Sequence, residues 1–188
     1  AKATTNRLVL ITTPESGDKL RFDIRQLQEF FAAECLYDSV KAEDLRTRIA
    51  TVAGDAHWRE VCHFLLSSLV ENDRSTELSV AVDELNRLND GEADGPDRIL
   101  HRRAGNGALL VARLLGEGVL EQDKAVRQKF RECLSPMAAF ANANRLSPLL
   151  RVSHENSRSW MFTFMLDRIR ESALAENIGA AIVLAHVL

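Results

Sequence analysis

The sequence predicts a mainly α-helical protein in which a short β-hairpin precedes an array of antiparallel helix pairs. Residues typical of strands are concentrated in the first 22 positions. From residue 27 onward, apolar side chains recur at the three- and four-residue spacing of amphipathic helices. Turn residues leave only short connections between most of these segments, which favours antiparallel packing of neighbouring helices.

The predicted hairpin comes first. Residues 7–13, RLVLITT, are rich in β-branched side chains and predict a strand. Residues 14–18, PESGD, contain turn formers, and residues 19–22, KLRF, alternate polar and apolar side chains as a second strand would. Because an isolated hairpin is only marginally stable in water, we expect a helix to cover it.

A helix is expected directly after the hairpin, with Asp23 as its N-cap. The stretch RQLQEFFAAECL is apolar over much of the helix circumference, which predicts burial on more than one side. Ala32 and Ala33 would allow a neighbouring backbone to come close. We therefore expect Phe30 and Phe31 to lie in a rigid, doubly buried joint between the hairpin and the helices that follow.

The rest of the chain is expected to be helical. Asp55 should cap a helix that begins near His57. Residues 97–115 should form one helix, in which Gly105 and Gly107 mark a break or a close helix contact. Both tryptophans are expected to be core anchors, because each lies within an apolar helical pattern. The apolar positions that define these helices are Leu45, Ile49, Val52, Ala53, Trp58, Val61, Cys62, Leu65, Leu66, Leu69, Leu78, Ala81, Val82, Leu85, Leu88, Val126, Phe130, Cys133, Leu134, Trp160, Phe164, Met165 and Ile169.

The rhythm of these segments is that of a HEAT-like solenoid. Helices of about 10 to 18 residues joined by short connections are typical of such proteins, in which a helix pair repeats every ~40 residues. The sequence has no clean repeat consensus. An irregular helical array is therefore an equal alternative to a regular solenoid.

Composition and chain ends narrow the class of protein. The net charge of −3 argues against a dedicated nucleic-acid-binding domain, which usually carries a basic excess. Three widely spaced cysteines fit a reducing compartment, and neither a signal peptide nor an apolar run of membrane-spanning length is present. We expect a cytoplasmic protein with no membrane partner. The missing initial Met and the apolar ending NIGAAIVLAHVL suggest a fragment of a longer chain.

The sequence predicts no catalytic, cofactor or metal site in this fragment. Gly-rich phosphate loops, a Walker lysine and the G-x-S-x-G motif are all missing. His57, Cys62 and His63 are close in sequence, but residues five apart on a helix point about 140° away from each other. A helix start and a core cysteine explain these residues better than a metal site does.

A basic patch is the best local candidate for binding a partner. Arg98, His101 and Arg102 follow helical spacing, and Arg103 lies beside them. Such a patch could bind phosphate or an acidic partner. The simpler interpretation is a solvated helix face whose arginines pair with nearby acids.

Two phrases of the sequence resemble NACHT-type STAND NTPases, which are large signalling ATPases of innate immunity and bacterial antiphage defence. In that family a winged-helix domain ends in a β-hairpin, an F-x-H-x-S/T-F-Q-E-Y/F-x-A-A phrase follows, and a W-x-E-V helix then opens a helical sensor region. The matching residues here are Phe22, Gln28, Glu29, Phe30, Ala32 and Ala33, and then Trp58, Arg59, Glu60 and Val61. The match covers residues 7 to about 70 of the chain.

One position departs from the family pattern. Ile24 stands where the family often has a histidine that reaches towards the phosphates of the bound nucleotide. Since isoleucine cannot make that contact, this stretch is expected to couple layers without touching nucleotide.

The resemblance implies two parts and a regulatory role. Residues 1–40 would close a winged-helix domain, and residues 41–188 would start the sensor array. The predicted joint between them consists of Phe22, Gln28, Glu29, Phe30, Phe31, Ala32, Ala33 and Trp58. It would couple recognition of a protein or nucleic-acid ligand to an upstream nucleotide-binding domain of the same chain.

The resemblance also implies properties of the whole protein. That protein would bind ATP and Mg²⁺, oligomerise and act in antiviral defence, whereas this fragment would bind no cofactor. The alternative function is a free-standing HEAT-like scaffold that binds a protein, or nucleic acid through Arg98, His101, Arg102 and Arg103.

Overall fold

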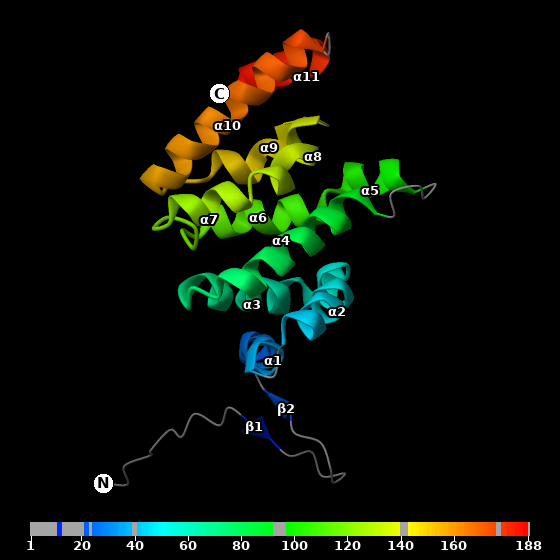
Figure 1. The fold of residues 1–188 in the computed structure, drawn as a ribbon, viewed down its shortest axis with the longest axis vertical. Helices are drawn as coiled ribbons and strands as arrows, with labels where there is room; N and C mark the ends of the chain where they lie inside the picture. Colours follow the sequence, from blue (N-terminus) through cyan, green and yellow to red (C-terminus); the bar gives the residue numbers. More distant parts are fainter. Residues whose placement is uncertain are drawn as a thin grey trace, which may run out of the picture.

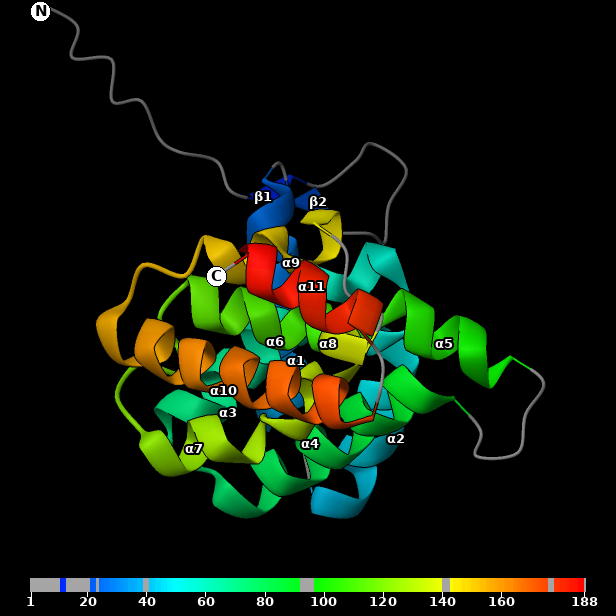
Figure 2. The same ribbon diagram turned by 90° about the horizontal axis from the view of Figure 1, so that it is seen from above.

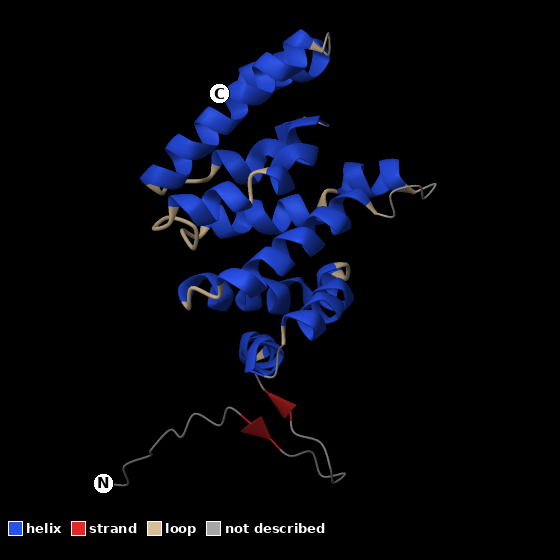
Figure 3. Cartoon of the chain, viewed as in Figure 1, coloured by secondary structure: helices blue, strands red, loops and turns tan. Residues whose placement is uncertain are grey.

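The computed structural model of the chain is mainly helical, as the sequence predicts (Figure 3). It describes residues 11–12, 21–22, 24–38, 41–91, 97–139, 143–175 and 178–187. Figure 1 shows helical layers stacked in the order of the sequence, from α1 at one end to α10 and α11 at the other. Seen from above, along the stack, α10 and α11 lie nearest to the viewer (Figure 2).

The helices have the following bounds. They are α1 Arg25–Asp38, α2 Ala42–Ala53, α3 Arg59–Glu71, α4 Ser75–Asp90, α5 Arg98–Ala104, α6 Asn106–Gly116, α7 Lys124–Lys129, α8 Ser135–Ala139, α9 Ala143–Leu150, α10 Glu155–Leu174 and α11 Ile178–Val187, with short 3₁₀ helices η1 Ala56–Trp58 and η2 Glu132–Leu134. Asp55 is a helix cap, since its carboxylate oxygen accepts a hydrogen bond of 2.8 Å from the backbone N–H of His57. It caps the 3₁₀ helix η1, however, and the α-helix expected from His57 begins only at Arg59.

Two short strands precede α1. β1, Ile11–Thr12, pairs antiparallel with β2, Arg21–Phe22, with Ile11 opposite Phe22 and Thr12 opposite Arg21. Two pairs of residues are too few to establish the hairpin predicted over 7–13 and 19–22. Most of that segment, including the predicted turn and the Asp23 cap, lies outside the described residues. The β-hairpin and the winged-helix remnant therefore stay predictions.

The packing of the layers follows a simple scheme. α1 lies against α3, α2 lies against α4, and α4 lies against both α3 and α6. α6 in turn contacts α9, and α10 pairs with α11. Apolar side chains that the helical spacing predicts fill these contacts, because each helix can shield only one face from water by packing on its neighbour. The largest fully buried side chains include Leu45, Ile49, Leu65, Leu66, Leu69, Leu78, Leu85, Leu110, Leu114, Leu115, Phe130 and Phe164.

The predicted helix over residues 97–115 is in fact two helices. Gly105 lies between α5 and α6 with a left-handed φ of 58°, a conformation that glycine adopts at little cost. Gly107 lies at a close helix contact, since a Cβ atom there would be only 2.3 Å from the backbone oxygen of Leu85 on α4. One glycine marks the break and the other marks the contact, so both expectations are confirmed.

The predicted boundary at residue 40 falls on residues 39–40, which lie outside the described part of the chain. The division into 1–40 and 41–188 thus stays a prediction. Among the described residues, no helix is both long enough and apolar enough to cross a lipid bilayer.

Candidate functional site

The contact between α1 and α3 brings together residues from both phrases of the resemblance. Ala33 on α1 is fully buried, Ala32 packs against the core, and Val61 on α3 is buried. The ring of Phe30 meets Phe64 of α3 edge-on, with 6.0 Å between the ring centroids. We call this contact between α1 and the first turns of α3, together with Arg113 of α6, the joint.

Phe30 and Phe31 are not doubly buried, contrary to the sequence-based expectation. Their exposed fractions are 41% and 49%. The reason is geometric: α1 rests on α3 through one face, which carries Glu29 and Ala33, and adjacent positions on a helix point in different directions. The alanines therefore form the close contact, while the two phenylalanines extend along its edge.

Trp58 is not a core anchor either. It lies at the end of η1 with 38% of its surface exposed and meets the ring of His57 edge-on. The 3₁₀ turn moves it away from the buried face that begins at Val61. Trp160, in contrast, packs against the core and stacks on Phe164, with 6.1 Å between the ring centroids.

A hollow of about 740 Å³ opens at the joint. Glu29 is buried beside it, and its carboxylate accepts a hydrogen bond of 2.7 Å from Nε of Arg25. Glu60 of the second phrase lines the same hollow, together with Ile24, Gln26 and Arg113. Two acidic residues that are 31 positions apart in the sequence thus face one space.

A series of ion pairs connects Glu60 at the joint to α6. Arg113 donates hydrogen bonds to Glu60 and, at 2.7 Å, to Glu117. The hydrogen bond from Arg113 is the main reason why the pKa of Glu60 lies below its usual value. Arg113 and Glu117 had no signal in the sequence, because they lie more than fifty residues from their partners on α3.

His63 lies next to Glu117 at the end of this series and is nearly inaccessible to solvent, with an exposed fraction of 3%. Its Nε2 atom lies 3.1 Å from a carboxylate oxygen of Glu117, but neither ring nitrogen makes a well-aligned hydrogen bond to the described residues. Burial lowers the pKa of His63, opposed by the negative charge of Glu117 and assisted by the positive charge of Arg113. His63 is therefore held neutral near pH 7.

Protonation of His63 should destabilise the protein below about pH 6.5. Because the pKa of His63 is lower in the folded state, the folded protein binds fewer protons at this residue than the unfolded chain does. The resulting stability is fully present above the unfolded-state pKa of about 6.5 and is lost as the pH falls below it. The expected slope is up to about 1.4 kcal/mol per pH unit within that window. Urea unfolding between pH 7.5 and pH 5 measures it.

The variant His63→Gln should flatten this pH dependence, because glutamine does not titrate. His57→Gln is the matched control, since it removes an exposed histidine from the preceding 3₁₀ turn. An unchanged slope in His63→Gln would show that other groups cause the acid destabilisation.

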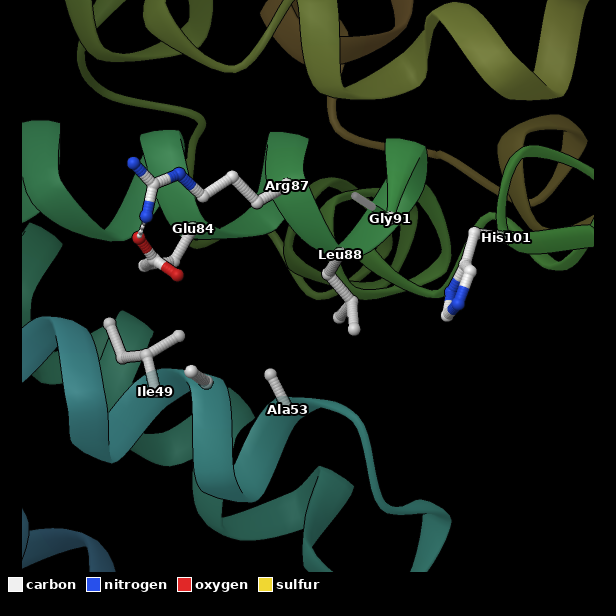
Figure 4. Close-up of a pocket in the computed structure, with 8 residues that line it drawn as sticks. Ile49, Ala53, Glu84, Arg87, Leu88, Gly91 and His101 are labelled. Carbon is white, nitrogen blue, oxygen red and sulfur yellow. Dashed lines mark hydrogen bonds and ion pairs between the residues drawn. The ribbon is translucent and has the colours of Figure 1, made fainter. Parts of the chain in front are cut away.

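The four residues of the predicted basic patch all lie on α5. Arg102 lies 3.3 Å from the carboxylate of Asp90, which agrees with the simpler interpretation of a paired arginine. His101 lines a hollow that is separate from the one at the joint, together with Leu88 and Gly91 (Figure 4). Arg98 and Arg103 are exposed. The role of these four residues as a surface for binding a partner stays a prediction.

The described residues offer few candidates for a reactive thiol or a metal site. Burial raises the pKa of Cys62 and of Cys133 to about 12, so both are thiols at neutral pH, while Cys35 is exposed. No group of three or more His, Cys, Asp or Glu residues that could hold a metal ion occurs within the described ranges.

Comparisons with protein-family models, with curated proteins and with solved structures found no match for this chain.

Proposed function

We propose that this chain is a non-catalytic regulatory part of a NACHT-type STAND ATPase. In this proposal the helical layers form an irregular, HEAT-like sensor array, and the joint couples it to an upstream nucleotide-binding domain of the same chain. The whole protein would bind ATP and Mg²⁺, oligomerise, and act in antiviral defence in the cytoplasm. The ligand of the array would be a protein or a nucleic acid.

The observation that carries the proposal is the hollow at the joint. Glu29 and Glu60 belong to the two separate phrases of the resemblance, and they line the same space. The ion pairs from Glu60 through Arg113 to Glu117 extend from that space along α6, and the buried His63 lies beside Glu117. A packed contact with a connected polar network is suited to transmit a rigid-body motion between two layers.

Neutralising Glu29 should change the coupling without unfolding the chain. In the whole protein that contains this chain, Glu29→Gln removes the charge that holds Arg25 while keeping the side-chain volume. We expect the basal rate of ATP hydrolysis to change by about twofold to thirtyfold, as a coupling energy of 0.5–2 kcal/mol implies. The rate of ATP turnover at saturating ATP measures this.

Glu34→Gln is the matched control, because Glu34 lies on the same helix but is not among the residues that line the hollow. Unfolding of the isolated chain should be nearly unchanged in both variants. Equal ATPase rates in wild type and Glu29→Gln would contradict a coupling role for the joint.

A free-standing HEAT-like scaffold is the second candidate. The sequence-ordered stacking of the layers in Figure 1 favours it, because such arrays commonly present long surfaces to protein or nucleic-acid partners. The exposed Arg98, His101 and Arg103 on α5 would be its contact residues, with Arg102 held by Asp90. A P-loop encoded upstream in the same reading frame would exclude this candidate, and its absence would exclude the first.

A further inference from the structure

Helix α10 has two faces of different use. One face packs on the array and buries Met161, Phe164 and Met165. The other face, which we call the outward face, contains positions 155, 159, 162, 166 and 170. Their spacing of four, three, four and four residues places them along one side of a helix. Since α10 and α11 form the last layer of the stack, this side of α10 is open to solvent (Figure 2).

The centre of the outward face is apolar. Phe162 and Leu166 lie one turn apart, with exposed fractions of 45% and 36%. Neighbouring large apolar side chains at a surface are typical of contacts with another protein, because covering them removes apolar area from water. A hollow of about 410 Å³ lies beside Phe162 and is lined also by Ser159 and Thr163. It is large enough to take an apolar side chain from a second helix.

The two ends of the outward face carry opposite charges. Glu155 is exposed in the first turn of α10, and Arg170 lies near the other end with 74% of its side chain exposed. Arg170 approaches Asp167 only at 3.5 Å, whereas Arg131 donates a hydrogen bond of 2.8 Å to the same carboxylate. A guanidinium has five N–H donors, so Arg170 can bind a further carboxylate from outside the chain.

These charges favour an antiparallel second copy of α10. If Leu166 of each copy lies opposite Phe162 of the other, Glu155 of each copy comes within one helical turn of Arg170 of the other. Twofold symmetry forms each of these contacts twice. A parallel arrangement would instead place Glu155 beside Glu155 and Arg170 beside Arg170, which like-charge repulsion disfavours.

We propose that the outward face of α10 binds the same face of a second copy of this chain in antiparallel orientation. Phe162 and Leu166 form the centre of the contact, and pairs of Glu155 with Arg170 at its two ends determine the orientation. The inference goes beyond the proposed function and does not rest on it, because all of the residues involved belong to this chain and no upstream domain is needed.

Analytical ultracentrifugation of the 188-residue chain tests self-association. We expect the mean mass to rise from the monomer value of 21.0 kDa towards twice that value as the chain concentration increases. Leu166→Glu should weaken the association about tenfold or more, because a charge replaces an apolar contact. Leu100→Glu is the matched control, since Leu100 is 61% exposed on α5. A monomer mass at all concentrations up to about 1 mM, or an equal loss in both variants, would overturn the proposal.

Two charge variants test the orientation. Glu155→Arg and Arg170→Glu should each self-associate more weakly than wild type, because like charges then meet at both ends of the contact. An equimolar mixture of the two variants should regain about the wild-type affinity, since each mixed dimer again pairs an acid with an arginine at both ends. Thermal unfolding of each variant verifies that it is folded. A mixture that associates no better than the separate variants would reject the inference.

Discussion

Replacing Asn89 with alanine should lower the free energy of unfolding by about 2–6 kcal/mol. Asn89 is buried on α4, where its amide nitrogen donates a hydrogen bond of 2.8 Å to the backbone oxygen of Cys133. Its amide oxygen accepts a bond of 3.0 Å from the backbone N–H of Ala108. Alanine would leave two buried backbone groups without partners, at about 1–3 kcal/mol each. Urea unfolding monitored by circular dichroism measures the loss.

Asn86→Ala is the control for this prediction. Asn86 lies one turn earlier on α4 and is only half-buried, so the same substitution should change the stability by about 0.5 kcal/mol or less. If the two variants were equally stable, Asn89 would not be holding α4, α6 and η2 together.

Gly107→Ala should be the second most damaging change, with an expected loss of about 1–3 kcal/mol. In an ordinary helix, alanine is more favourable than glycine by about 1 kcal/mol. Here the added methyl group would be 2.3 Å from the backbone oxygen of Leu85 and 3.0 Å from the amide oxygen of Asn89. Because a backbone atom cannot rotate away, α6 would have to move off α4, and the cost of that movement exceeds the gain in helix propensity. The thermal midpoint and the urea midpoint both report it.

Gly116→Ala provides the matched control on the same helix. Apart from the adjacent residues and the backbone of the helix itself, no heavy atom of the described structure lies within 4 Å of the Cβ position at Gly116. Alanine there should be neutral or should stabilise the protein by up to about 1 kcal/mol. Opposite signs for the two glycines would establish that α6 packs on α4 at Gly107, whereas a stabilising Gly107→Ala would show that the two helices do not approach so closely.

Much of the core could be predicted because helical spacing is a local property. Leu45 and Ile49 on α2, and Leu78 and Leu85 on α4, are buried as the three- and four-residue pattern indicates. The Asp55 cap and the break at Gly105 could also be predicted, since each depends on the backbone of a few neighbouring residues.

The candidate site was only partly predictable. The sequence pointed to Glu29 and Glu60 through a resemblance, but it carried no sign that Arg113, Glu117 and His63 would connect to them. It also placed Phe30, Phe31 and Trp58 in the interior, whereas all three are considerably exposed. Hydrophobicity alone favours burial, yet a helix packed through one face leaves some of its large side chains at the edge.

The sequence by itself determined that this chain is mainly helical, where several of its helices begin and which faces they bury. These outcomes follow from backbone geometry and from the spacing of apolar side chains along each helix. Only the tertiary structure decided which acids and arginines meet at the joint, that Asn89 links three elements, and that Glu84, Arg87 and His101 surround one hollow. Such contacts join positions tens of residues apart, and they depend on how whole layers stack, which no local pattern encodes.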